Sequence, residues 1–245
     1  MRMTDDPHAA SRALVSVETK TLEAVSEPLP PRSKPRPRLV SNLWWKRSID
    51  LAIGLPLLLA CLPLIGLLAL IVRLDSPGPA FFRQERVGLH GKRFWMWKLR
   101  TMYAGSADAR HRQAAADWFA GQPSNDRYKT LGDPRITGFG RWVRRLDLDE
   151  LPQLFNVICG EMSLVGPRPA IPYELDLYEP AFMARLQVPP GITGLWQVTR
   201  RDRLSAPEMM ALDLRYVRET SLWLDLKTLV LTAPALLSAA LGRDS

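Results

Sequence analysis

The apolar residues of this chain are most concentrated between Leu51 and Val72, a run of 22 residues without a charge. As an α-helix, this run would be about 33 Å long, close to the roughly 30 Å thickness of the apolar part of a bilayer. The pattern therefore predicts a membrane segment. A buried helix of a soluble protein is the weaker alternative, because basic residues flank the run on both sides.

Two features argue against a simple span. Pro63 lies in the middle of the run; it lacks an N–H and clashes with the carbonyl of Leu59, which kinks or breaks a helix. Each half would be only about 15–18 Å long, enough to reach the bilayer midplane but not to cross. A spanning helix usually carries more Lys and Arg on one flank, whereas here both flanks are basic. A re-entrant helix over residues 41–75, entering and leaving through one face, fits both features.

The chain before this helix has a different composition. Between Pro28 and Arg38, prolines alternate with arginine and lysine. Such a segment has little to bury, so residues 1–40 are expected to form a disordered basic tail. A proline-rich ligand for a partner protein is the alternative, and a tail beside a membrane surface fits better.

Residues 76–245 are expected to form one domain with short strands and several helices. The apolar C-terminal stretch is interrupted by Asp225, Lys227 and Pro234, which favours an amphipathic helix at a membrane interface; a C-terminal core helix is the alternative. The fold class is α+β, mostly helical, with a small β element. The expected elements are strands at Ala80–Phe82 and Arg93–Trp97 around a Gly88/Gly91 turn, a helix over 104–120, and the C-terminal helix over Ser221–Leu241.

Composition limits the partners of the chain. Its 245 residues carry a formal charge of +8 with a pI near 9.9, which favours anionic partners such as nucleic acid, lipid surfaces or phosphorylated small molecules. Cys61 and Cys159 suggest neither a disulfide framework nor a metal site. The late start of the first apolar stretch predicts no secretory signal.

Four polar clusters place basic side chains beside rigid Gly and Pro backbone. That combination suits phosphate binding, because fixed amides and guanidinium groups meet the oxygens of an anion. Lys98, Arg100, Arg144 and Arg168 are the candidate phosphate ligands, although Arg168 could simply pair with a neighbouring carboxylate. The clusters are Lys98–Met102, Arg144–Pro152, Val165–Pro169 and Pro190–Gly194 with Trp196–Val198.

Asp149 and Glu150 allow two interpretations. Neighbouring residues of a helix point about 100° apart, so these two are not a facing pair of the glycosidase type. One could attack a substrate while the other binds a cation. Alternatively, Asp149 could cap a helix over Glu150–Ile158, with Pro152 in the first turn and Gly160 just past the end. The two interpretations are compatible, because a helix N-terminus attracts phosphate.

Together these motifs resemble the bacterial sugar transferase family, the monotopic phosphoglycosyl transferases. The resemblance covers about residues 44 to 240, and the order of the motifs makes it specific. The motifs are Lys46-Arg47-x-x-Asp50, the apolar segment with Pro63, Phe82-x-Gln84-x-Arg86-x-Gly88, Lys98-x-Arg100-Thr101-Met102, Asp149-Glu150-Leu151-x-Gln153-Leu154-x-Asn156-Val157, Met162-Ser163-x-Val165-Gly166-Pro167-Arg168-Pro169 and Pro190-Gly191-Ile192-Thr193-Gly194.

The resemblance implies a two-step reaction. Asp149 would attack the β-phosphate of a UDP-sugar and release UMP, and polyprenyl phosphate would then take the phosphosugar from the aspartate. Glu150 would bind Mg²⁺, Arg168 would belong to the nucleotide or phosphate site, and Arg201 would contact phosphate. The enzyme would act on the cytoplasmic face of the bacterial inner membrane, among membrane lipids, in the first membrane step of exopolysaccharide, O-antigen or glycoconjugate synthesis. A second copy of the chain, in a homodimer, is a further candidate partner.

The sequence departs from the family pattern at two positions. Leu62 replaces the serine that often precedes the helix-breaking proline, and Arg200 stands where a glycine is common. Three other functions compete with the transferase: a non-catalytic membrane scaffold for polysaccharide assembly, a nucleic-acid-binding protein, and a metal-dependent glycosyltransferase that makes a glycosidic bond. The sequence contains no nucleic-acid recognition motif, so no nucleic-acid partner is expected.

Overall fold

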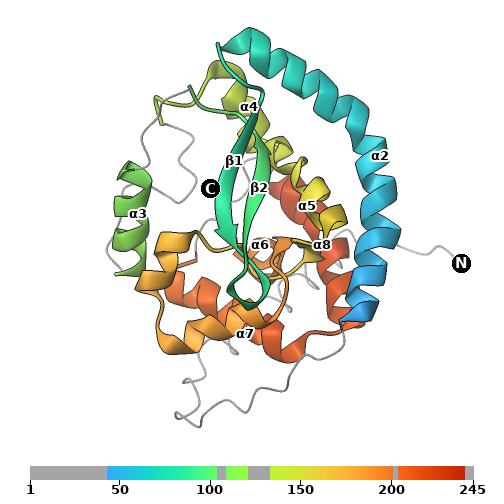
Figure 1. Ribbon diagram of the computed structural model, residues 1–245, viewed down its shortest axis with the longest axis vertical. Helices are drawn as coiled ribbons and strands as arrows, with labels where there is room; N and C mark the ends of the chain where they lie inside the picture. Colours follow the sequence, from blue (N-terminus) through green and yellow to red (C-terminus); the bar gives the residue numbers. More distant parts are fainter. Residues whose placement is uncertain (1–42, 104–108, 121–132, 201–203, 241–245) are drawn as a thin grey trace, which may run out of the picture. The chain divides into compact units, whose positions relative to one another are not determined.

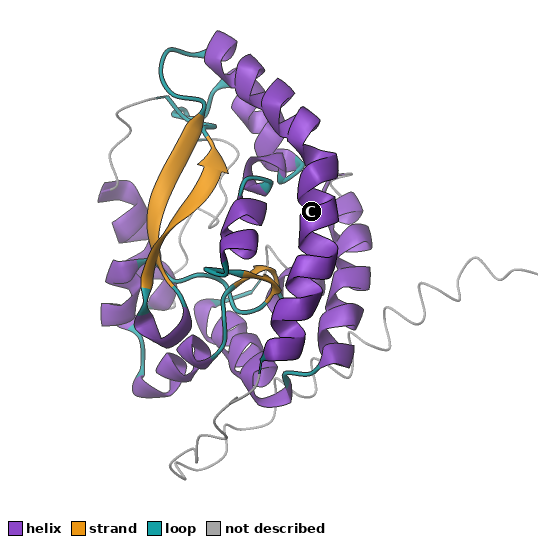
Figure 2. Ribbon diagram, turned by 45° about the vertical axis from the view of Figure 1, so that its right-hand side comes forward, coloured by secondary structure: helices purple, strands orange, loops and turns teal. Residues whose placement is uncertain are grey.

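The computed structural model describes residues 43–103, 109–120, 133–200 and 204–240. They belong to one compact unit, residues 39–245; the tail predicted over residues 1–40 lies outside the described residues. Within them, helices surround a β-hairpin and a second short strand pair (Figure 1, Figure 2). The prediction of a mostly helical α+β fold with a small β element is confirmed.

The elements follow one another along the chain. The α-helices are α2 (Trp44–Asp75), α3 (Ala109–Phe119), α4 (Gly138–Arg145), α5 (Gln153–Cys159), α6 (Leu195–Arg200), α7 (Ala206–Glu219) and α8 (Leu222–Ala240). The 3₁₀ segments are η1 (Leu89–Gly91), η2 (Leu148–Glu150), η3 (Pro172–Leu177) and η4 (Pro180–Gln187). The strands are β1 (Phe81–Val87), β2 (Arg93–Leu99), β3 (Ser163–Val165) and β4 (Gly191–Thr193).

Helix α2 is continuous over 32 residues and contains both Pro56 and Pro63. Of the two effects predicted for Pro63, a kink or a break, the break is therefore wrong. A proline removes one backbone hydrogen bond and crowds one carbonyl, and a bend relieves both without ending the helix. Both prolines lie on the exposed side of α2, which curves along its length (Figure 1).

The two sides of α2 differ in burial. The inner side is one stripe at helical spacing, buried against the rest of the unit: Lys46, Asp50, Gly54, Leu58, Ile65, Leu68 and Val72. The outer side carries exposed apolar side chains: Leu51, Ile53, Leu55, Leu57, Leu59, Leu62, Leu64, Leu67, Leu70 and Leu74. So large an exposed apolar surface marks an interaction with an apolar environment. Among the described residues, α2 is the one helix whose length and composition would allow it to cross a bilayer.

Buried polar side chains fix the N-terminal end of α2. The Lys46 ammonium donates to the Asp225 carboxylate at 2.6 Å and to the Tyr216 hydroxyl at 2.8 Å. One turn further on, the Asp50 carboxylate accepts from the Ser163 hydroxyl at 2.8 Å. These contacts join α2 to β3, α7 and α8.

Arg100 holds the C-terminal end of α2. Its buried guanidinium follows β2 and donates to the backbone carbonyls of Val72, Ser76 and Pro77. Carbonyls in the last turn of a helix have no hydrogen-bond partner within the helix. A cation there donates hydrogen bonds to them and interacts favourably with the negative end of the helix dipole. Both ends of α2 therefore contact the same folded unit.

We expect Lys46→Met to lower the free energy of unfolding by about 3 kcal/mol, because it leaves Asp225 buried without its ammonium partner. Thermal unfolding in detergent measures the effect. Lys227→Met is the matched control on exposed α8 surface and should change stability by less than about 0.5 kcal/mol. Equal unfolding temperatures for the two variants would contradict a stabilising role for the buried pair.

The two strand pairs have different geometries. Strands β1 and β2 form an antiparallel hairpin in which Phe81 pairs with Leu99 and Val87 with Arg93; its strands are confirmed and are longer than predicted. Strands β3 and β4 are parallel, with Ser163 opposite Gly191. The short pair brings the segment after α5 beside the segment before α6.

Gly191 is required for the close approach of β3 and β4. A Cβ atom there would lie 2.1 Å from the Gly166 amide nitrogen and 2.4 Å from the Thr193 carbonyl oxygen, both backbone atoms. We expect Gly191→Ala to destabilise the protein by about 3 kcal/mol or more. Gly66→Ala is the control, because a Cβ at Gly66 would meet no atom within 4 Å beyond the local backbone of its own helix. Chemical denaturation of both variants checks the prediction, which fails if both unfold like the unmodified chain.

Helix α8 is apolar over most of its surface, and the amphipathic interfacial helix expected there stays a prediction. Asp225 and Thr228 are buried, on the side that faces the unit. The other side exposes an apolar stripe: Leu222, Trp223, Leu226, Val230 and Leu237. The described part of the helix predicted over 104–120 is α3, and residues 104–108 lie outside the described residues.

Candidate functional site

Asp149 and Glu150 lie in η2, between α4 and α5. Asp147 precedes them with a left-handed backbone, φ 54°, which turns the chain sharply after α4. Helix α5 begins only after Pro152, where no side chain caps the helix. The interpretation that Asp149 caps a helix over Glu150–Ile158 is therefore wrong, since the 3₁₀ turn separates Asp149 from the start of α5.

The two carboxylates of this turn differ in burial and in their contact with Lys98. Asp149 is 4% exposed, whereas Glu150 is half-buried. The Lys98 ammonium on β2 donates to Glu150 Oε1 at 3.0 Å. The structure therefore brings three predicted residues together: one buried carboxylate, and beside it a carboxylate paired with a lysine.

Arg168 lies in the loop after β3 and pairs with Glu174 on η3. Its two terminal nitrogens lie 3.1 to 3.3 Å from the Glu174 carboxylate oxygens, and both side chains are buried. Burial disfavours the Glu174 carboxylate, but Arg168 and Arg86 outweigh that effect and hold its pKa below the usual value. The alternative that Arg168 pairs with a neighbouring carboxylate is confirmed.

Arg86 was not among the predicted site residues. It is buried on β1 and donates to the Pro169 carbonyl at 2.8 Å and to Gln84 at 2.6 Å. Burial lowers its pKa, whereas the charges of Glu174 and Glu150 act in the opposite direction. Arg86 therefore fixes the Arg168 loop to the hairpin and places a positive charge near the carboxylates of both Glu150 and Glu174.

A second buried ion pair, Arg185 with Asp213, contacts the backbone of Arg168. The Arg185 guanidinium donates to the Asp213 carboxylate, to the Tyr178 hydroxyl and to the backbone carbonyl of Arg168. Burial raises the pKa of Asp213 to about 6, although Arg185 opposes the shift. The sequence held one signal for this pair: Asp213 occupies the apolar face of α7, at helical spacing from the buried Met209.

The other predicted ligands lie elsewhere. Arg100 contacts the last turn of α2, and nothing in these contacts tests a phosphate role. Arg144 lies near the end of α4, and its Nη1 is 3.4 Å from the Thr101 hydroxyl. Arg201 lies outside the described residues.

The Mg²⁺ ion expected from the resemblance would need substrate oxygens beside Glu150. Within the described ranges, no group of three or more His, Cys, Asp or Glu side chains could hold a metal on its own. Mg²⁺ is commonly bound by one or two carboxylates together with phosphate oxygens and water. Glu150 is the residue that would hold such an ion, and its present partner is Lys98.

Comparison with known proteins agrees with the motifs. Residues 41–239 match the Bacterial sugar transferase family. The undecaprenyl-phosphate glucose phosphotransferase of Komagataeibacter xylinus is 42% identical over 80% of this chain but only 36% of its own length. The UDP-glucose:undecaprenyl-phosphate glucose-1-phosphate transferase of Caulobacter vibrioides is 42% identical over 83% of this chain and 73% of its own. The exopolysaccharide production protein ExoY of Rhizobium meliloti is 38% identical over 78% of this chain and 84% of its own length. This chain belongs to the bacterial sugar transferase family.

Proposed function

We propose that this protein transfers a sugar-1-phosphate from a UDP-sugar to polyprenyl phosphate, as the first membrane step in the synthesis of an exopolysaccharide, O-antigen or other glycoconjugate. The observation that carries the proposal is the pair of carboxylates, Asp149 buried and Glu150 bound to Lys98. The names of the relatives support the reaction, since two specify sugar phosphate transfer to undecaprenyl phosphate and one names a UDP-sugar.

The proposed chemistry consists of two displacements at one phosphorus. An Asp149 carboxylate oxygen attacks the β-phosphorus of the donor, and the bond between that phosphorus and the bridging oxygen breaks. UMP leaves with the bridging oxygen, and the sugar phosphate stays on Asp149 as an acyl phosphate. A phosphate oxygen of the acceptor then attacks the same phosphorus, which restores the carboxylate and forms a diphosphate-linked sugar.

The surrounding residues have distinct proposed roles. Lys98 and Arg168 attract and orient the donor phosphates, because cations fixed in a low-dielectric site stabilise the charge of the transition state. Arg86 and Arg185 hold the Arg168 loop in place. Mg²⁺ on Glu150 would reduce the repulsion between the Asp149 carboxylate and the diphosphate.

The proposed membrane arrangement is re-entrant. Both ends of α2 contact one folded unit, through Lys46 and Asp50 at one end and Arg100 at the other. A helix that crossed the bilayer would place its two ends on opposite sides. The exposed apolar surfaces of α2 and α8 would lie in the inner membrane and at its interface, with the site on the cytoplasmic face.

Cysteine labelling tests this topology. In a chain lacking Cys61 and Cys159, single cysteines replace the exposed Trp44 or Asp75 at the two ends of α2. We expect an impermeant maleimide to label neither site in intact cells and both in opened vesicles. Labelling of one site alone from outside would identify a spanning helix.

The reaction itself is tested by UMP release from a panel of UDP-sugars, with Mg²⁺ and undecaprenyl phosphate, on protein in nanodiscs. Release that depends on one sugar supports the proposal and identifies the donor. A product with a diphosphate-linked sugar separates this reaction from a glycosyltransferase that makes a glycosidic bond. No release from folded protein with any donor would favour the non-catalytic scaffold.

A further inference from the structure

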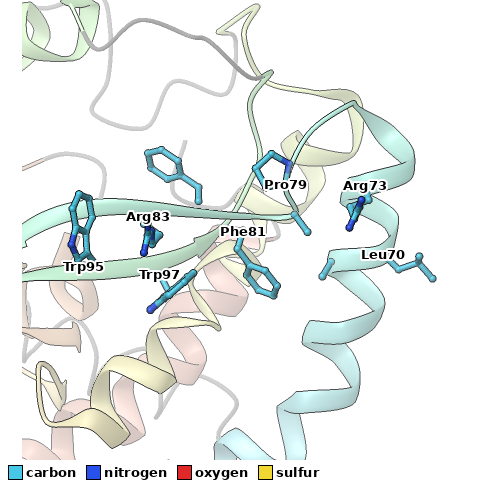
Figure 3. Close-up of a pocket in the computed structure, with 10 residues that line it drawn as sticks. Leu70, Arg73, Pro79, Phe81, Arg83, Trp95 and Trp97 are labelled. Carbon is cyan, nitrogen blue, oxygen red and sulfur yellow. The ribbon is translucent and has the colours of Figure 1, made fainter.

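An apolar groove lies between the C-terminal half of α2 and the β1–β2 hairpin (Figure 3). Its volume is about 750 Å³, within the range of sites that bind small molecules. Figure 3 shows Leu70 and Arg73 on α2, with Phe81, Arg83, Trp95 and Trp97 on the hairpin. The groove is lined by Ala69, Leu70, Arg73, Pro79, Ala80, Phe81, Phe82, Arg83, Trp95 and Trp97.

The lining combines apolar surface with positive charge. It includes two arginines and no acidic residue. Arg83 lies over the rings of both Trp95 and Trp97, at 5.3 and 5.6 Å from their centroids. Phe81 packs edge-on against Trp97 at 6.4 Å. These contacts order the groove before any ligand binds. The combination of aromatic surface and two arginines suits an amphiphile with an anionic head and an apolar chain.

The groove adjoins the exposed apolar surface of α2 and the hairpin that carries Lys98. At one side is Leu70, which belongs to the exposed apolar face of α2. At the other is Trp97, whose side chain points to the face of β2 opposite that of its neighbour Lys98, the partner of Glu150. The groove therefore lies where a chain embedded beside α2 would meet the strand that carries Lys98.

We propose that this groove binds the polyprenyl phosphate acceptor, an inference that rests on the proposed function. The first isoprene units pack on Leu70, Phe81 and Trp97, and the positive charges of Arg73 and Arg83 attract the phosphate to this end of the molecule. A bulk phospholipid fits less well, because the groove is a single recess on the hairpin that carries Lys98 rather than a uniform surface along the helix.

The test separates the acceptor from the donor. Arg83→Gln removes one charge from the groove, and Trp97→Leu removes the ring on which Arg83 and Phe81 pack. For each variant, we expect the KM for undecaprenyl phosphate to rise about tenfold: Arg83→Gln loses roughly one charge-assisted contact, and Trp97→Leu loses the aromatic surface for the isoprene units and the ring that orders Arg83. The UMP released in a single turnover without acceptor should stay unchanged, because that step uses only the donor and Asp149.

Arg93→Gln is the matched control, since Arg93 lies at the other end of the same hairpin with its side chain 65% exposed and paired with Glu85. It should leave both measurements unchanged. Direct binding of undecaprenyl phosphate to each variant in nanodiscs, without donor, tests the groove even if the chain released no UMP. Wild-type acceptor affinity in both groove variants would overturn the proposal. So would weaker binding to anionic phospholipid vesicles with an unchanged acceptor KM, which would assign the groove to bulk lipid.

Discussion

Asp149→Asn is expected to abolish turnover, with a loss of at least about 10³-fold, because a carboxamide cannot act as the nucleophile that takes up the phosphosugar. UMP release should disappear both with and without acceptor. Asparagine has nearly the same size as aspartate, so the fold should persist and the thermal unfolding temperature should change little. The measurement is UMP release over time, together with intact-protein mass after mixing the unmodified enzyme with donor alone, which should show one added phosphosugar.

Asp147→Asn provides the matched control two residues earlier. Asp147 has a left-handed backbone, a conformation that asparagine adopts readily. This variant should keep near-normal activity, which would show that a lost negative charge in this segment is not enough to stop the reaction. Activity close to normal in Asp149→Asn would instead remove Asp149 from the chemistry.

Local sequence patterns predicted the parts of the fold that depend on neighbouring residues. The uncharged run indicated α2, the turn glycines indicated the hairpin, and the last apolar stretch indicated the helix α8. Gly160 ends α5 with a positive φ of 79°, as its position predicted. Pro63 was misjudged because the cost of a proline depends on whether the helix can bend, which the packing of its inner face decides.

The environment of the site could not be predicted in the same way. Arg168 and Glu174 are close in sequence, but Arg86, Arg185 and Asp213 meet them only through the packing of β1, η4 and α7. Arg100 is a further example: its place beside Lys98 suggested a phosphate ligand, which stays a prediction, whereas the contact of its guanidinium with the end of α2 had no signal in the sequence. A cation in a motif does not reveal which anion or carbonyl it contacts.

Arg168 and Arg185 are expected to differ in what they contribute, although both are buried arginines of one network. Arg168→Lys keeps the charge but loses the planar fork that contacts Glu174 and, in the proposed reaction, the donor phosphates. We expect kcat/KM for the donor to fall about 100-fold, with a small change in unfolding temperature.

Arg185→Lys should lower stability more than activity, the reverse of what is expected for Arg168→Lys. Arg185 contacts Asp213, Tyr178 and the Arg168 carbonyl, and a lysine cannot reach all three from one position. We expect the free energy of unfolding to fall by about 2–3 kcal/mol, while the folded protein loses less activity than Arg168→Lys does. Donor kinetics and thermal unfolding of both variants distinguish the roles. If Arg168→Lys lost stability rather than activity, Arg168 would serve only to pair with Glu174, and the donor phosphates would have to rely on Lys98 and the metal.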